Sequence, residues 1–137
     1  MSSSPATVLI IDDLASVRLY HVSFLRRKGY RCLEAMDGRG ALEILAGQTI
    51  NLILLDLVMP GMDGEAFIEH LDRDPAAANL PVLVITSEQE LAAGLVSRAR
   101  RPIAVVTKPV MPDALLRAAQ QLLATECRAP VGAGHAE

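Results

Sequence analysis

Short aliphatic runs alternate along the chain with stretches in which apolar residues recur at helical spacing. Continuous apolar runs are typical of parallel strands covered by helices on both faces, and their alternation with helical stretches indicates βα units. The runs predict five strands: V-L-I-I (8–11), R-C-L-E-A (31–35), N-L-I-L-L-D (51–56), P-V-L-V-I-T (81–86) and P-I-A-V-V-T (102–107).

Five helices are predicted, one after each strand. In the first helix, Val17, Tyr20 and Phe24 share a face, and Gly29 follows its basic end, where a glycine commonly terminates a helix. The other predicted helices cover residues 37–47, 65–73, 88–100 and 112–123. The alternation predicts an α/β fold with one doubly wound, five-stranded parallel sheet.

Composition narrows the classes of protein that this chain can be. Its 137 residues suit one domain, which we place at 7–124 between flexible ends at 1–6 and 125–137. Aromatic residues make up only 3% of the chain, which argues against a function built on aromatic stacking. The formal net charge of −3 gives no basic field, so direct binding to nucleic acid is not expected.

The two cysteines and the N-terminus indicate a cytoplasmic protein. Cys32 and Cys127 make no disulfide framework, and neither has neighbours at the spacing of a zinc site. The N-terminal M-S-S-S-P-A-T lacks the basic start of a signal peptide. No apolar run approaches the roughly 20 residues that span a bilayer, so no membrane association is expected.

Polar residues follow four of the predicted strands at their carboxyl ends. Asp12 and Asp13 follow the first strand, Asp56 ends the third, Thr86 the fourth, and Lys108 follows the fifth. In an open parallel sheet, ligands bind beyond the carboxyl ends of the strands, so these side chains are expected to share one rim.

Three carboxylates on one rim suit a hard divalent cation such as Mg²⁺, which prefers oxygen ligands. Such a cation would also explain the adjacent Asp12 and Asp13, whose charges repel by about 4 kcal/mol at 4 Å and an effective dielectric of 20. Asp56 stands alone at the end of an apolar strand and is the best candidate for a nucleophile toward a phosphoryl group.

Structural interpretations compete with each of these assignments. One aspartate of the pair could cap the first helix, but capping leaves the other unexplained. Two further groups are interpreted as structural or surface residues. The histidines, expected to be structural or exposed, are His21, His70 and His135. The arginines, expected to form a solvated basic patch, are Arg98, Arg100 and Arg101.

The polar rim and its flanking sequences resemble the receiver domains of two-component response regulators. V-L-I-I-D-D, L-L-D-L-V-M-P-G-M-D-G, V-L-V-I-T-S and V-T-K-P are similar to four signatures of that family, in its order. The resemblance covers residues 7 to 124 and implies a flavodoxin-like (βα)5 fold. It also implies a signalling module, not an enzyme, with a cis peptide bond between Lys108 and Pro109.

The resemblance further implies a mechanism. Asp56 would accept a phosphoryl group from a histidine kinase or histidine phosphotransfer protein, and the product would change binding to a downstream protein target not yet known. The implied site residues are Asp13 and Asp56 as direct Mg²⁺ ligands, Asp12 as a ligand through water, the backbone carbonyl of Val58 as a further ligand, Thr86 as the switch hydroxyl and Lys108 as the phosphate partner.

The chain departs from the family pattern near the last strand. Val105 stands where receivers often carry an aromatic residue, and Arg101 and Pro102 replace a common Gly-Ala pair. Coupling to an output is therefore the least certain implication. The short segment after the last predicted helix favours a stand-alone receiver, and the alternative is the receiver fragment of a larger regulator or hybrid kinase.

Two other classes of protein share part of this pattern. Haloacid-dehalogenase-like phosphatases also use an aspartate nucleophile and Mg²⁺, but they carry D-x-D where this chain has D-L-V (56–58). A flavodoxin-like cofactor binder would need a phosphate-binding loop after the first strand, where D-D-L-A-S (12–16) supplies acid instead. Both classes are disfavoured.

Overall fold

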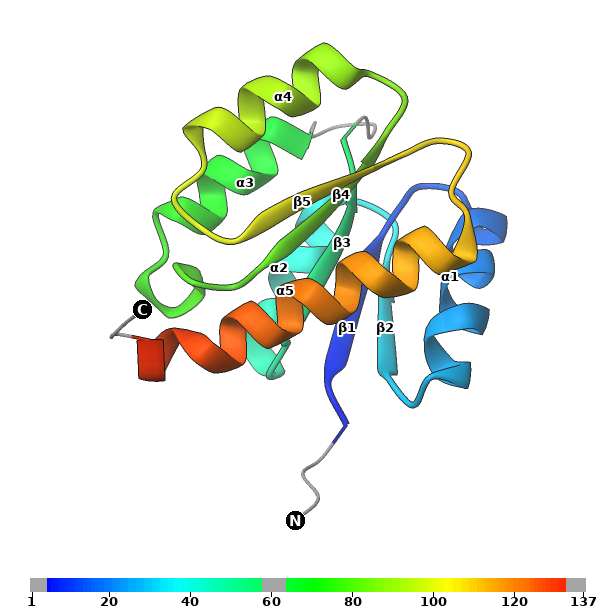
Figure 1. Ribbon diagram of the computed structural model, residues 1–137, viewed down its shortest axis with the longest axis horizontal. Coiled ribbons are helices and arrows are strands. Elements are labelled where there is room, and N and C mark those ends of the chain that lie inside the picture. Colours follow the sequence, from blue (N-terminus) through cyan, green and yellow to red (C-terminus); the bar gives the residue numbers. More distant parts are fainter. Residues whose placement is uncertain (1–4, 58–63, 133–137) are drawn as a thin grey trace.

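The computed structural model describes residues 5–57 and 64–132. Within them, five strands alternate with five α-helices (Figure 1). The elements are β1 (Thr7–Ile11), α1 (Ala15–Arg27), β2 (Arg31–Ala35), α2 (Gly38–Gly47), β3 (Leu52–Asp56), α3 (Gly64–Asp72), the 3-10 helix η1 (Pro75–Ala77), β4 (Val82–Thr86), α4 (Gln89–Arg98), β5 (Ile103–Thr107) and α5 (Pro112–Gly132). The strands pair in parallel in the order β2-β1-β3-β4-β5, which confirms the predicted flavodoxin-like fold.

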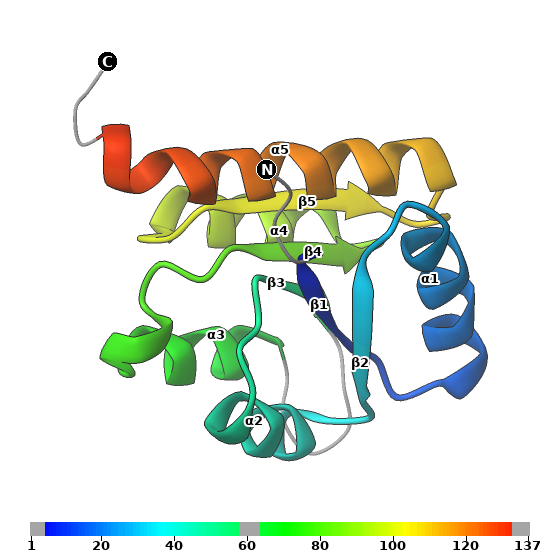
Figure 2. The same ribbon diagram turned by 90° about the horizontal axis from the view of Figure 1, so that it is seen from below.

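The core lies in two layers, one on each face of the sheet. Strands β3 and β4 are buried along their whole length, as their uninterrupted apolar runs predicted. Leu9 and Ile53 pack with residues of α2, α3 and α4, whereas Ile10 and Leu54 pack with residues of α1 and α5. Figure 2 shows α5 and α1 on the opposite side of the sheet from α2 and α3. Each fully buried Leu or Ile side chain contributes about 1.5–3 kcal/mol to the free energy of unfolding.

Helix α1 ends as the sequence predicted. Gly29 has a φ of +93°, a conformation that glycine adopts without steric cost. The Gly29 N–H donates to the Arg26 carbonyl at 3.0 Å, and the Tyr30 N–H donates to the Leu25 carbonyl at 3.1 Å. These two bonds form a Schellman motif, which turns the chain into β2.

Helix α5 is longer than predicted. It continues to Gly132, past the helix end expected at 123 and past the domain limit placed at 124. The segment 125–129 lacks an apolar period, but Ala, Glu and Arg within it are good helix formers. The predicted helix end at residue 123 is therefore wrong, because the helix continues to Gly132.

Arg101 corrects another expectation, because it is buried rather than part of a solvated patch. Its side chain is 1% exposed and reaches Asp72, with Nη2 2.7 Å and Nε 3.1 Å from Oδ1. Nη1 donates to the carbonyls of Ala77 and Leu80 at 2.7 and 2.8 Å. The guanidinium thereby joins the start of β5 to the end of α3 and the following loop. Arg98 and Arg100 are exposed, as expected.

Candidate functional site

Three carboxylates meet at the carboxyl ends of β1 and β3. Asp12 and Asp13 follow β1 directly, and Asp56 is the last residue of β3. Each offers a carboxylate oxygen, and these oxygens lie within 4.8 Å of one another. Asp12 is 3% exposed and Asp56 8%, while Asp13 is the most exposed of the three. We refer to this cluster as the acidic site.

Asp12 carries an electrostatic cost within the acidic site. Burial raises the pKa of its carboxyl, and the charges of Asp56 and Asp13 raise it further. The Leu14 N–H, which donates to Asp12 Oδ1 at 3.0 Å, opposes this shift, as does the Lys108 charge. Clustered carboxylate oxygens that destabilise one another's charge are the donor set that a hard divalent cation stabilises, so these residues fit a Mg²⁺ ion.

Lys108 brings a positive charge to the same rim. It follows β5, and its Nζ lies 3.7 Å from Asp56 Oδ2, with the side chain 43% exposed. The peptide bond between Lys108 and Pro109 is cis, as the sequence resemblance implied. The Lys108 N–H donates to the Thr86 carbonyl at 3.1 Å, which joins the ends of β4 and β5 beside the acidic site.

Thr86, the last residue of β4, is buried, and its hydroxyl is engaged with the chain that follows. Oγ1 accepts a hydrogen bond from the Glu88 N–H at 2.9 Å, immediately before α4 begins. The structure therefore places Thr86 at the same end of the sheet as Asp56, with its hydroxyl oxygen holding the start of α4.

Other residues from the sequence interpretation lie elsewhere. Val58, implied as a backbone ligand, lies outside the described residues, as does His135. His21 is 2% exposed on α1, and its Nδ1 has no hydrogen-bond partner among the described atoms. His70 is exposed on α3. Val105 is partly buried in β5 and packs against the core layer under α4.

Arg18 supports the acidic site and was missed by the sequence interpretation. From α1, its Nη1 donates to the Asp12 carbonyl at 2.7 Å, and its Nε donates to Glu34 Oε1 on β2 at 2.9 Å. The sequence contains a signal for this role, because Arg18 lies in the first turns of a predicted helix, where the helix dipole disfavours a cation. An arginine at such a position indicates specific partners.

Gly64, the first residue of α3, is needed for close packing behind Asp56. A Cβ added there would lie 2.7 Å from the Leu57 Cα and 2.8 Å from the Leu57 carbonyl oxygen. The Gly64 N–H also donates to that carbonyl at 2.6 Å. Leu57, which follows Asp56 directly, is thereby held against the start of α3.

Comparison with known proteins agrees with this geometry. The family model described as "Response regulator receiver domain" matches residues 8–120. Protein Rrf1 of Nitratidesulfovibrio vulgaris is 30% identical over 121 residues, which cover 88% of this chain and 85% of Rrf1. The phosphate regulon transcriptional regulatory protein PhoB of Pseudomonas aeruginosa is 34% identical over 61% of this chain, a match that spans 37% of PhoB.

Solved structures show the same similarity. The chemotaxis protein CheY4 of Vibrio cholerae aligns with a TM-score of 0.76 and 29% identity, covering 86% of this chain and 98% of CheY4. None of the helices in the described residues is long and apolar enough to cross a membrane.

Proposed function

The chain belongs to the response regulator receiver domain family, and from this premise we propose that Asp56 is its phospho-accepting residue. Receivers are signalling modules of two-component systems rather than enzymes. One observation carries the assignment: Asp56 is the carboxylate of the acidic site that lies nearest to a cation, 3.7 Å from the Lys108 ammonium. The two partners of a phosphoryl group, a nucleophile and a counter-charge, thus already face each other.

The proposed reaction is a transfer between side chains. An Asp56 carboxylate oxygen forms a bond to phosphorus, the bond from phosphorus to the donor imidazole nitrogen breaks, and that nitrogen keeps the electron pair. Lys108 neutralises a phosphoryl oxygen, and the Thr86 hydroxyl donates to another. We propose a histidine kinase or histidine phosphotransfer protein as the donor, and a protein whose binding changes on phosphorylation as the target.

A Mg²⁺ ion is the proposed cofactor of this transfer. Asp13 and Asp56 would bind it directly, the Val58 carbonyl would be a further ligand, and Asp12 would act through water. When bound, the ion would neutralise charge on the phosphoryl oxygens. Support comes from the three carboxylate oxygens that lie within 4.8 Å of one another. Arg18 holds the Asp12 carbonyl and so keeps this segment in position.

Phosphorylation by a small acyl phosphate tests the proposal, because the domain itself supplies the nucleophile and the counter-charge. With acetyl phosphate and Mg²⁺, intact-mass spectrometry should detect one added phosphoryl group, and the Asp56→Asn variant should gain none. Asp113→Asn, which changes an exposed carboxylate on α5, is the matched control and should be labelled like the wild type. Undiminished labelling of Asp56→Asn would mean that another residue accepts the phosphoryl group. Equal labelling with and without a chelator would mean that the transfer does not need Mg²⁺.

A further inference from the structure

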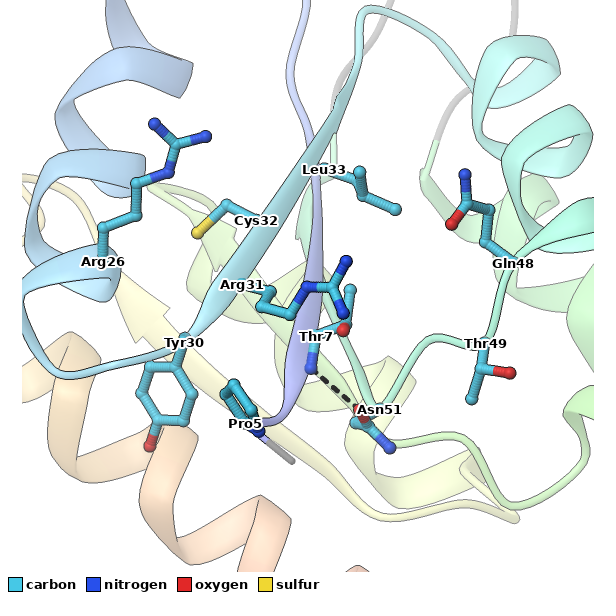
Figure 3. Close-up of a pocket in the computed structure, with 10 residues that line it drawn as sticks. All are labelled: Pro5, Thr7, Arg26, Tyr30, Arg31, Cys32, Leu33, Gln48, Thr49 and Asn51. Atoms are coloured by element: carbon cyan, nitrogen blue, oxygen red, sulfur yellow. Dashed lines mark hydrogen bonds between the residues drawn. The ribbon is translucent and has the colours of Figure 1, made fainter. Parts of the chain in front are cut away.

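A pocket of about 970 Å³ lies at the end of the sheet opposite the acidic site. It is formed around the amino-terminal ends of β1 and β2, with the end of α1 on one side and the connection from α2 to β3 on the other (Figure 3). We call it the edge pocket, because β2 is an outer strand of the sheet. Nothing in the proposed phosphoryl transfer uses it.

The edge pocket is basic. Arg26 and Arg31 line it, no acidic residue does, and the exposed Arg27 and Lys28 lie beside it in the chain. None of these four cations forms an ion pair with a residue that the structure describes, whereas Arg18, Arg98, Arg101 and Lys108 all do. In a chain with a net charge of −3, this is a local excess of unpaired positive charge.

The two arginines of the edge pocket flank β2 on opposite faces. Figure 3 shows the Cys32 side chain turned toward Arg26 on α1, while Arg31 and Leu33 point to the other side of the strand. Successive side chains of a strand alternate between its two faces, so this arrangement follows from the pleat. A ligand that contacts both arginines must therefore extend across the edge of β2.

The outer edge of β2 also offers backbone groups. The Arg31 N–H donates to the Ala6 carbonyl, and the Ala35 carbonyl accepts from the Asp12 N–H, so alternate residues from 31 to 35 face β1. The N–H and C=O groups of Cys32 and Glu34 consequently point away from β1. Such groups are a template for pairing with another extended segment.

We propose that this edge binds an extended acidic segment of a partner protein by strand addition. The segment would pair with the backbone of Cys32 and Glu34. Its side chains would alternate between the two faces of the sheet, so that one carboxylate reaches Arg26 and the next reaches Arg31. The unpaired arginines favour an acidic partner over a second copy of this chain, because two copies would bring like charges together.

A labelled peptide in which Val-Val pairs alternate with Glu-Glu pairs tests the proposal by fluorescence anisotropy with the full chain, because adjacent glutamates place carboxylates on both faces of a strand. We call it the alternating peptide. The matched control peptide has the same charge but carries proline at two Val positions, which prevents strand pairing. We expect the alternating peptide to bind and the proline peptide to bind at least about tenfold more weakly. In hydrogen-exchange NMR, the alternating peptide should slow exchange of the Cys32 and Glu34 amides.

Charge variants test the role of the two arginines. Arg26→Gln and Arg31→Gln should each weaken binding of the alternating peptide about two- to fivefold, the effect of one exposed charge pair. Arg39→Gln, an exposed arginine of α2 outside the edge pocket, should leave binding unchanged. The wild type and the three variants should be phosphorylated alike by acetyl phosphate. Failure of strand addition is therefore distinguishable from failure of the proposed function.

Three results would overturn strand addition. Equal binding of the two peptides, without slower exchange of the Cys32 amide, would mean that the peptides bind by charge attraction alone. Equally effective competition by tripolyphosphate in the absence of amide protection would mean a site for compact anions. No binding of the alternating peptide, together with self-association of the Arg26→Gln, Arg31→Gln double variant, would mean that the charges only keep copies of the edge apart.

Discussion

The Thr86 hydroxyl and the Glu88 backbone N–H form a 2.9 Å hydrogen bond across the start of α4. Thr86 is buried beside the acidic site, and Glu88 immediately precedes the helix. A threonine oxygen that turns to a phosphoryl group on Asp56 lengthens or loses this bond. The bond therefore connects the proposed phosphorylation site to the position of α4.

We predict that phosphorylation changes the backbone of residues 87 to 101 and leaves the Val105 rotamer unchanged. Val105 is β-branched and stiff at χ1, so it cannot make the swing available to an aromatic residue. Structures of the free protein and of its beryllofluoride complex would measure both. Backbones that superimpose over 87–101, beside a rotated Val105, would contradict the prediction.

Mg²⁺ should stabilise the folded protein by about 2.7 kcal/mol when its concentration is a hundred times Kd. Chemical denaturation with and without chelator measures this. Asp13→Asn should remove most of the stabilisation, because it removes a proposed direct ligand. If Mg²⁺ stabilises that variant as strongly as the wild type, the ion binds elsewhere.

Asp12→Asn should stabilise the metal-free protein at neutral pH. The raised pKa means that, as pH increases from 3.8, the unfolded chain loses its Asp12 proton before the folded protein does, so stability falls through this interval. Asparagine avoids that loss and can still accept the bond from Leu14. The gain in the free energy of unfolding should be present at pH 7 and absent at pH 3. Equal gains at both values would exclude an ionisation effect.

His21 should make the protein less stable in mild acid. Burial lowers its pKa, the nearby Lys108 charge lowers it further, and Asp56 opposes the shift. As pH falls below 6.5, the unfolded chain binds the His21 proton first, so stability decreases until the lowered pKa of the folded state is passed. Unfolding free energies at pH 7.5 and 5.5 should differ less in His21→Leu than in the wild type. The matched control is the exposed His70→Gln, which should keep the wild-type difference.

Gly64→Ala should destabilise the fold by about 1–3 kcal/mol, the usual cost of overpacking. The new Cβ overlaps the Leu57 backbone, which cannot move without shifting the end of β3. Labelling of Asp56 by acetyl phosphate should slow in the same variant. Gly47→Ala is the control, because nothing lies within 4 Å of its added Cβ, and it should be neutral or slightly stabilising. Equal stability of the two variants would show that Leu57 adjusts freely.

Arg101→Met should cost about 3 kcal/mol or more, because it leaves the carbonyls of Ala77 and Leu80 and the Asp72 carboxylate without their shared donor. Arg100→Met, at an exposed position, should change stability by no more than about 0.5 kcal/mol. Urea denaturation of the two variants makes the comparison. A cost below 1 kcal/mol for Arg101→Met would show that the loop satisfies its carbonyls in another way.

The features that sequence could predict are those set by local pattern and by the geometry of parallel sheets. Apolar runs without a polar residue gave β3 and β4, and Gly29 gave the end of α1. The meeting of Asp12, Asp13 and Asp56 followed because strands in a parallel sheet end on one side. Each of these inferences needs only residues near one another in sequence or a general rule of topology.

The features that sequence missed depend on pairs far apart in the chain. Arg101 belongs to a run of arginines that looks solvated, and nothing local indicates that Asp72 and two carbonyls surround it. The need for glycine at position 64 cannot be read from the sequence, because its contact with Leu57 exists only in the folded protein. The length of α5 was missed for a different reason, since residues 125–129 have helix propensity without an apolar face.

The buried Arg101 fixes the C-terminal end of α4, so the helix can rotate about that end. At its C-terminal end the helix is held by Arg98, paired with Glu65 at 3.0 Å, and by Arg101 just beyond. At the other end, the Glu88 N–H donates to the Thr86 hydroxyl oxygen, and Leu91 and Ala92 pack onto the core. A ten-residue helix is about 15 Å long, so a rotation of about 10° about its C-terminal end moves its N-terminal end by about 2–3 Å. The displacement would be largest beside the phosphorylation site and would decrease toward Arg98. A partner that distinguishes the phosphorylated protein through α4 must therefore bind the first turn of this helix.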